Sequence, residues 1–216
     1  FGTFGGGLGE YDRVKQRLTF LMNDPKDPNS LNDNSVNAIY EDRAGTLWFA
    51  TGSGGLNRID KGSKSFSHYT EDPANPGSLS HKIVTGLLED RVGVLWVGTS
   101  GGLNRFDRAT GRFAHYTNDP EDPHSLGANA TSGLLEDSRG MLWIGTWGSG
   151  LARLDPTRKE CAHFLHDPQN PNSLGGNIIL SLFEDSHGKL WIGTSGGVLD
   201  QYDRESRVFI HYRHDP

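Results

Sequence analysis

The sequence predicts an all-β protein built from repeated four-stranded antiparallel units of about 48 residues. Three observations support this prediction. A Leu-Trp pair recurs at nearly constant spacing, short apolar runs of five or six residues alternate with turn residues, and no window sustains a helical period. The repeated tryptophans are Trp48, Trp96, Trp143 and Trp191, at intervals of 48, 47 and 48 residues.

Other markers keep the same phase as the tryptophans. A glycine closes each Glu-Asp-x-x-Gly turn, at Gly45, Gly93, Gly140 and Gly188. An aspartate ends a later segment, at Asp12, Asp60, Asp107, Asp155 and Asp203. An Asp-Pro pair begins at Asp24, Asp72, Asp119, Asp167 and Asp215. Because these markers are independent and share one period, composition alone does not explain the repeat.

One unit shows how the strands are expected to follow one another. Residues 83–88, 94–99, 103–107 and 112–117 read as strands, separated by EDRVG, SGG and RATG. Four strands per unit is the content of a β-propeller blade, and a single blade buries both of its faces only by packing against neighbours. The most apolar run, 83–88, is expected to be the innermost strand.

The sequence therefore predicts a single β-propeller fragment over residues 1–216, with about four and a half blades. The expected divisions are a partial blade 1–25 and blades 26–73, 74–120, 121–168 and 169–216. Phe1-Gly2-Thr3 matches Phe49-Ala50-Thr51, so the first blade lacks its inner strands. We expect a longer parent chain to supply them, or the exposed strand edges to close the ring by self-association.

Composition excludes several classes of protein. The 29 glycines and only 10 prolines indicate many tight turns, and the net charge of −6 argues against a nucleic-acid partner. The single cysteine, Cys161, cannot form an internal disulfide and takes the phase of core phenylalanines. No apolar run approaches the length of a membrane span.

The repeat resembles the two-component regulator propeller repeat. The resemblance rests on Asp-Pro-x-Asn/Asp-Pro-x-Ser-Leu, Glu-Asp-x-x-Gly-x-Leu-Trp-x-Gly-Thr and Gly-Gly-Leu-x-x-x-Asp, and it covers nearly the whole chain. It implies a ligand-sensing, extracytoplasmic (periplasmic or extracellular) part of a bacterial sensor kinase or hybrid two-component protein, with a downstream signalling domain in the parent chain. Members of the family usually have about seven blades per propeller, so this chain departs from the pattern in length.

Recurring polar residues suggest no catalytic or metal site. The Glu-Asp pairs occur in every unit and point to opposite faces of a strand, whereas an active site needs one convergent cluster. The histidines of the fourth strand lie on different blades, too far apart to share a metal. These histidines are His68, His115, His163 and His211. We therefore expect no catalytic residue, no metal and no cofactor, and we interpret the four tryptophans as blade-packing residues rather than as sugar platforms.

A ligand site is expected where the repeat is broken, in the loops between the second and third strands and in the connections between blades. These two sets of loops emerge on one face of a propeller, around the mouth of its channel. Phe4 and Trp147 replace small residues of the first set, and either could stack on a ligand or cover a neighbouring blade. Polar residues just before the inner strand could bind a ligand or cap strand ends: Asn34, His81, Lys82, Asn129 and Asn177.

The function expected from these residues and the resemblance is a non-catalytic sensor module that binds a small molecule or oligosaccharide. Glycans and other polar metabolites are the expected ligands. Two alternatives stay open: a scaffold for protein interaction or self-assembly, and a propeller-type lyase or hydrolase.

Overall fold

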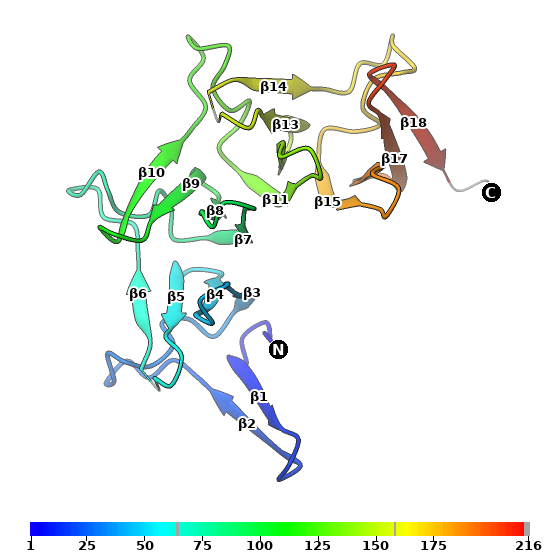
Figure 1. Cartoon of the computed structure of the whole chain (residues 1–216). Coiled ribbons are helices and arrows are strands. Elements are labelled where there is room, and N and C mark those ends of the chain that lie inside the picture. The colour runs from blue at the N-terminus through cyan, green and yellow to red at the C-terminus, as the bar shows by residue number, and fades with distance from the viewer. Residues whose placement is uncertain (64, 158, 214–216) are drawn as a thin grey trace. The chain divides into compact units, whose positions relative to one another are not determined.

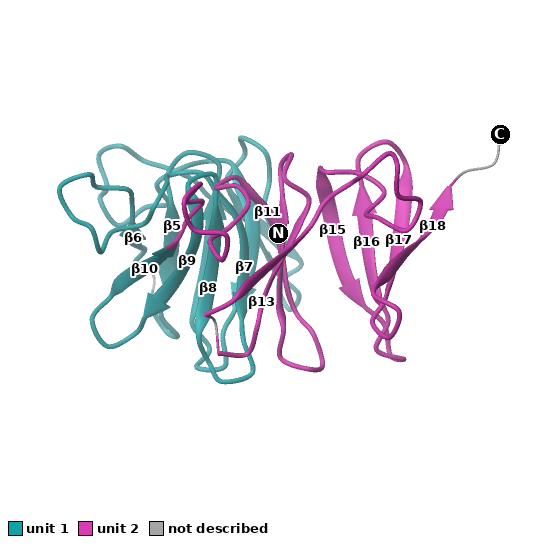
Figure 2. Cartoon of the chain, turned by 90° about the horizontal axis from the view of Figure 1, so that it is seen from above, with its two compact units in different colours: residues 1–115 teal, residues 116–216 magenta. Residues whose placement is uncertain are grey.

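The computed structural model describes residues 1–63, 65–157 and 159–213, and all regular structure in this part of the chain is β-strand (Figure 1). The chain consists of two compact units, Phe1–His115 and Tyr116–Pro216 (Figure 2).

Unit 1 contains a two-stranded and two four-stranded antiparallel sheets, each a simple meander. Its strands are β1 (Leu8–Asp12), β2 (Arg17–Leu21), β3 (Val36–Glu41), β4 (Leu47–Thr51), β5 (Leu56–Ile59), β6 (Ser67–Tyr69), β7 (Val84–Glu89), β8 (Leu95–Thr99), β9 (Gly102–Asp107) and β10 (Arg112–Tyr116), the last of which ends one residue past the unit. Unit 2 contains two four-stranded sheets. Its strands are β11 (Thr131–Glu136), β12 (Leu142–Thr146), β13 (Leu151–Leu154), β14 (Cys161–Phe164), β15 (Ile179–Glu184), β16 (Leu190–Thr194), β17 (Val198–Asp203) and β18 (Val208–Arg213).

The all-β class and the four-stranded blade are confirmed. The strands predicted at 83–88, 94–99, 103–107 and 112–117 occur as β7 to β10, with boundaries that differ by at most one residue. In all four complete sheets the pairing of the first strand with the second slips by one residue near its start, for example between Thr131 and Gly133. This β-bulge is a repeated feature of the blade that hydrophobic alternation did not reveal.

Two of the repeated tryptophans, Trp48 and Trp143, lie between neighbouring sheets of the same unit, whereas Trp191 contacts Tyr212 of its own sheet at 5.4 Å. In unit 1 the buried Trp48 of β4 packs edge-on against Phe106 of β9, with ring centroids 5.2 Å apart. In unit 2 the buried Trp143 of β12 contacts Tyr202 of β17 in the same way, at 5.4 Å. Each such ring buries a large apolar area, so these contacts stabilise the packing of adjacent sheets, together with the aliphatic residues of the same clusters.

The aspartate of each Glu-Asp pair holds its own turn and its own tryptophan. In the first complete blade, one carboxylate oxygen of Asp42 accepts hydrogen bonds from the N–H groups of Ala44 and Thr46, at 3.0 and 2.9 Å. The other oxygen accepts the indole N–H of Trp48 at 2.9 Å. Gly45 completes the turn with a φ of 77°, a left-handed conformation that favours glycine. The same indole bond joins Trp96 to Asp90, Trp143 to Asp137 and Trp191 to Asp185.

The glutamate of the pair belongs to a contact with the preceding blade. Arg108, after β9, reaches back to Asp42 at 2.7 Å and also binds Glu89 of its own blade at 3.2 Å. In unit 2, Arg204 likewise binds Asp137 at 3.2 Å and Glu184 at 2.6 Å. Each arginine thus links the aspartate of one Glu-Asp pair to the glutamate of a pair in the next blade. Within the repeat, the aspartate therefore serves the interface with the following blade and the glutamate serves the interface with the preceding one, as expected for neighbouring residues whose side chains point to opposite faces.

Candidate functional site

The connections between blades and the loops between second and third strands meet on one face of each unit. In unit 1, Gly7 donates its N–H to the carbonyl of Asn34 at 2.8 Å, and Gly55 donates to the carbonyl of Lys82 at 2.7 Å. In unit 2, Gly148 and Gly150 both donate to the carbonyl of Asn177, at 3.1 and 2.8 Å. The candidate ligand-binding loops are thus in contact, and we refer to this side as the loop face.

The blade connections have an internal frame of their own. In the second connection, Ser78 Oγ accepts the N–H of Asp72 and donates to its carbonyl, both at 3.0 Å, while Leu79 is fully buried. Equivalent bonds form at Ser30, Ser125 and Ser173. The Asp-Pro-x-x-Pro-x-Ser-Leu motif therefore supports a rigid loop.

The asparagines before the inner strands use their side-chain carbonyls within these connections. Asn34 Oδ1 accepts the N–H of Asn23 at 2.7 Å, and Asn177 Oδ1 accepts that of His166 at 2.8 Å. Asn129 does the same for Asn118 at 2.6 Å. These oxygens cap the connection, so the amide NH₂ ends are the groups that a ligand could meet.

His81 and Lys82 break this pattern in the third blade. His81 Nδ1 accepts the N–H of Ile83 at 3.0 Å, whereas the side chain of Lys82 is exposed. Because an ammonium group cannot accept a hydrogen bond, Lys82 does not take the capping role of the asparagines. Its charge is available to solvent or to a ligand.

Trp147 has a fixed backbone and a free side chain. Its N–H donates to the carbonyl of Ala130 at 2.9 Å, and it forms an isolated β-bridge with Ile178. These bonds place it between the strand starts that carry Asn129 and Asn177. The side chain is nevertheless 56% exposed. The structure thus brings Asn129, Trp147 and Asn177 together in unit 2.

Phe4 is the aromatic residue at the same phase in unit 1. Its side chain is 97% exposed, in a loop that Gly7 ties to Asn34 and that Thr3 ties to Val36. Phe4 and Asn34 therefore belong to one loop cluster, and His81 and Lys82 belong to the next connection of unit 1.

The fourth-strand histidines contact backbone. His68 and His115 place Nε2 at 2.8 and 2.7 Å from the carbonyls of Ser30 and Ser78. His211 lies 2.9 Å from the Pro171 carbonyl and 2.6 Å from Asp200. Within the described residues no group of three potential metal ligands occurs. Cys161 is buried, and burial raises the pKa of its thiol to about 11, so the thiol does not act as a nucleophile at neutral pH.

Sequence reasoning missed the arginine bridges on the opposite side, the side of the Glu-Asp-x-x-Gly turns. Arg108 and Arg204 each follow a marker aspartate, but Lys61 and Pro156 stand at that phase in other blades. A search for positions of the repeat at which only some blades carry arginine would have found these two residues. A search limited to loop positions at which a single blade differs from all the others would not.

Four-stranded meanders joined through their tryptophans define the class of this chain as a β-propeller protein. The family description "Two component regulator propeller" matches residues 30–53, 78–101, 125–148 and 173–196. The chain therefore contains four segments that match the two-component regulator propeller repeat.

Solved structures share this fold. The extracellular domain of the hybrid two-component system BT3049 from B. thetaiotaomicron is 30% identical, with a TM-score of 0.80, over 95% of this chain and 27% of that one. That of BT4673 from the same organism is 20% identical, with a TM-score of 0.65, over 96% of this chain and 34% of that one. The chain thus spans about a third or less of both structures.

Virginiamycin B lyase from Staphylococcus aureus shares the fold at 15% identity, with a TM-score of 0.67, over 98% of this chain and 64% of the lyase. At this identity the likeness concerns the fold alone. A search of curated protein sequences gives no match. Among the described residues, no helix has the length and apolar character needed to cross a membrane.

Proposed function

We propose that the chain is part of an extracytoplasmic, non-catalytic ligand-sensing propeller of a bacterial signal-transduction protein. Its repeats and its 30% identity to the extracellular domain of a hybrid two-component system support this class. The ligand would bind at the loop face, and a downstream domain of the parent chain would receive the signal.

The observation that carries the binding proposal is the exposed indole of Trp147. A tryptophan half in solvent loses the burial that stabilises Trp48 and Trp143, so its presence in a glycine-rich loop calls for another role. Its backbone is fixed on both sides, which lowers the entropy lost when a ligand stacks on it. Asn129 and Asn177 flank it with amide groups, a combination that suits a polar ligand with a flat or ring-shaped body, such as a glycan.

Substitution of Trp147 by serine tests this proposal, because serine stands at that phase in Ser100 and Ser195. Glycan-array binding would identify a ligand, and calorimetry would measure its affinity. Loss of a central aromatic contact should weaken binding by about 2 kcal/mol, or about thirtyfold. Phe183→Ser is the matched control, since Phe183 is also exposed, at 62%, but lies in β15.

Equal binding by wild type and the Trp147→Ser variant would refute the loop-face site. So would a loss of equal size in the Phe183→Ser control.

One observation favours a second function, an interaction scaffold. Large apolar side chains on the β15–β18 sheet are exposed: Leu180, Phe183, Leu199 and Ile210. Exposed apolar patches mark association surfaces. Sedimentation analysis would detect self-association, which Phe183→Ser should weaken and Trp147→Ser should not.

A further inference from the structure

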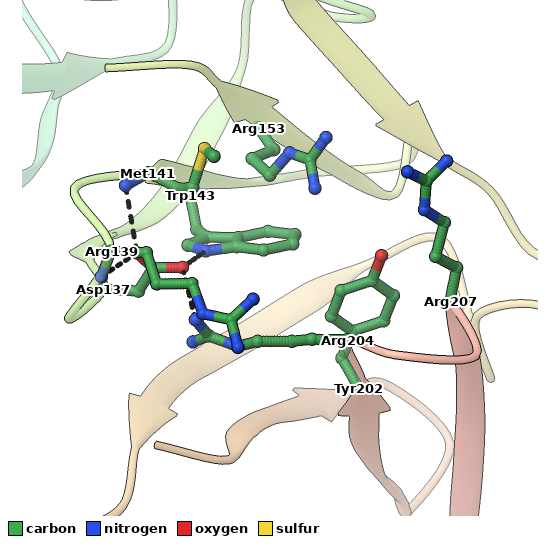
Figure 3. A pocket seen from close by; sticks show the side chains of 8 residues that line it. All are labelled: Asp137, Arg139, Met141, Trp143, Arg153, Tyr202, Arg204 and Arg207. Atoms are coloured by element: carbon green, nitrogen blue, oxygen red, sulfur yellow. Dashed lines mark hydrogen bonds and ion pairs between the residues drawn. The ribbon is translucent and has the colours of Figure 1, made fainter.

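A pocket of about 220 Å³ lies in unit 2 on the side of the Glu-Asp-x-x-Gly turns (Figure 3). The β11–β12 turn with β12 and β13 contributes one part of its lining, and the β17–β18 hairpin contributes the other. Four arginines take part: Arg139, Arg153, Arg204 and Arg207. Such a concentration of positive charge is unusual in a chain of net charge −6.

Within the described residues, Arg204 is the one member of this group with acidic partners. Arg204 is nine-tenths buried and binds both Asp137 and Glu184. Even so, its Nε–H is buried and meets no acceptor among the described residues.

The other three guanidinium groups form no ion pair within the described part of the chain. Arg153 lies over the rings of Trp143 and Phe164, at 5.5 and 5.6 Å. Arg139 and Arg207 are exposed at the rim. In Figure 3, Arg153 lies on one side of the Trp143 ring and Arg139 on the other.

Asp155, which follows β13, makes hydrogen bonds within its own turn. Asp155 and Glu160 line a separate hollow that also includes Arg153. The oxygens of Asp155 accept hydrogen bonds from Thr157 Oγ1 at 2.6 Å and from the N–H of Lys159 at 3.0 Å. Asp155 is therefore engaged in its own turn.

Unit 1 offers an internal reference, because the same phases there lack the extra charges. Ala44 and Gly111 stand where unit 2 has Arg139 and Arg207. The counterpart of Arg153 is Arg58, which binds Asp60 at 2.6 Å. Arg58 also donates to the hydroxyl of Tyr69 at 3.3 Å. The structural arginine bridge is thus common to both units, whereas the unpaired arginines belong to unit 2.

Further breaks of the repeat add surfaces for an organic ligand. Tyr202 replaces Phe106, and Met141 replaces Thr46. Figure 3 shows the Tyr202 hydroxyl directed toward the side of Arg153 and Arg207. The pocket therefore combines donors with a thioether and an aromatic edge.

We propose that this pocket binds a small dianion that bears carboxylate or phosphate oxygens. Guanidinium groups repel one another when unpaired and bind such oxygens through paired N–H donors. Three unpaired arginines suit a charge of two, and the volume admits only a compact molecule. This inference goes beyond the proposed function, because the pocket lies away from the loop face and does not include Trp147.

Calorimetric titration with succinate and with inorganic phosphate, at low ionic strength, tests the proposal. Succinamide, the neutral analogue of succinate, should not bind. The double variant Arg139→Ala/Arg207→Gly restores the residues of unit 1, and glycine accepts the φ of 59° at Arg207 without strain. It should weaken binding of the dianion at least tenfold.

The matched control is Arg13→Ala/Arg17→Ala, which removes two exposed arginines from unit 1 and changes the net charge equally. It should bind as wild type does, and so should Trp147→Ser. Binding of succinate alone or phosphate alone supports the pocket and identifies the oxyanion. Absence of binding by both anions overturns the proposal, as does equal weakening in the control or equal binding of succinamide.

Discussion

Replacement of Asp42 by asparagine should destabilise unit 1 far more than an isosteric change on a turn normally does. The Asp42 side chain is buried and receives the indole N–H of Trp48, the N–H groups of Ala44 and Thr46, and the guanidinium of Arg108. An asparagine keeps one acceptor oxygen and turns the other position into a donor. Either the backbone N–H groups of the turn or the side chains of Trp48 and Arg108 must therefore lose their acceptor oxygen.

The magnitude follows from these lost contacts. A buried donor left without a partner costs about 1–3 kcal/mol, and removing one member of a buried ion pair costs about 3–5 kcal/mol. Arg108 is partly exposed, so water compensates for part of its loss. We expect a decrease of about 2–4 kcal/mol in the free energy of unfolding.

Urea denaturation followed by circular dichroism measures this change. The control is Asp60→Asn in the same blade, where the carboxylate is 52% exposed and binds Arg58. An exposed ion pair contributes about 0–1 kcal/mol, so the control should change little. If the two variants lose the same stability, the Asp–Trp contact does not hold the blade together and the reasoning is wrong.

Two further predictions concern ionisation. Burial alone would raise the pKa of Asp42, but the hydrogen bonds from Trp48 and Arg108 outweigh it and hold the pKa below the usual value. A lowered pKa in the folded state contributes stability above the unfolded pKa of about 3.9, and this contribution is lost as the pH falls through the folded pKa. The stability difference between wild type and Asp42→Asn should therefore shrink below about pH 4 in thermal melts, and a constant difference would contradict the assignment. The Cys161 thiol is 5% exposed, with a pKa of about 11, so iodoacetamide should label it slowly at pH 8 and quickly in urea; fast labelling of the native protein would show that the residue is not part of the core.

Much of the fold could be predicted because the repeat marks positions that every blade needs. A tryptophan at one phase, a left-handed glycine at another and apolar runs between them specify strand order without knowledge of contacts. The β-bulge was missed because it shifts pairing by one residue without changing composition. The hydrogen bond that Trp48 donates to Asp42 was not predicted for another reason. The turn of Glu-Asp-x-x-Gly accounts for only one of the two carboxylate oxygens of Asp42, the one that accepts the backbone N–H groups of Ala44 and Thr46.

The candidate site was less predictable. Sequence reasoning placed Trp147 and Asn177 in loops of one face, and the structure brings them together. It could not tell that the asparagine oxygens serve the connections, because an amide that caps a loop and one that binds a ligand are the same in sequence. Arg139 and Arg207 were not predicted as site residues because each lies alone in an ordinary turn of the sequence. Only the packing of two sheets brings them to one pocket.

Four tryptophans each donate their indole N–H to an aspartate of their own blade, whereas the side chain of the fifth, Trp147, is exposed. Hydrogen exchange of the five indole N–H groups, resolved by NMR of the chain labelled with ¹⁵N, tests both parts together. Trp48, Trp96, Trp143 and Trp191 donate to aspartates and should exchange slowly, whereas Trp147 should exchange at nearly the rate of a free indole. Slow exchange at Trp147, or fast exchange at Trp48 or Trp143, would contradict the claim.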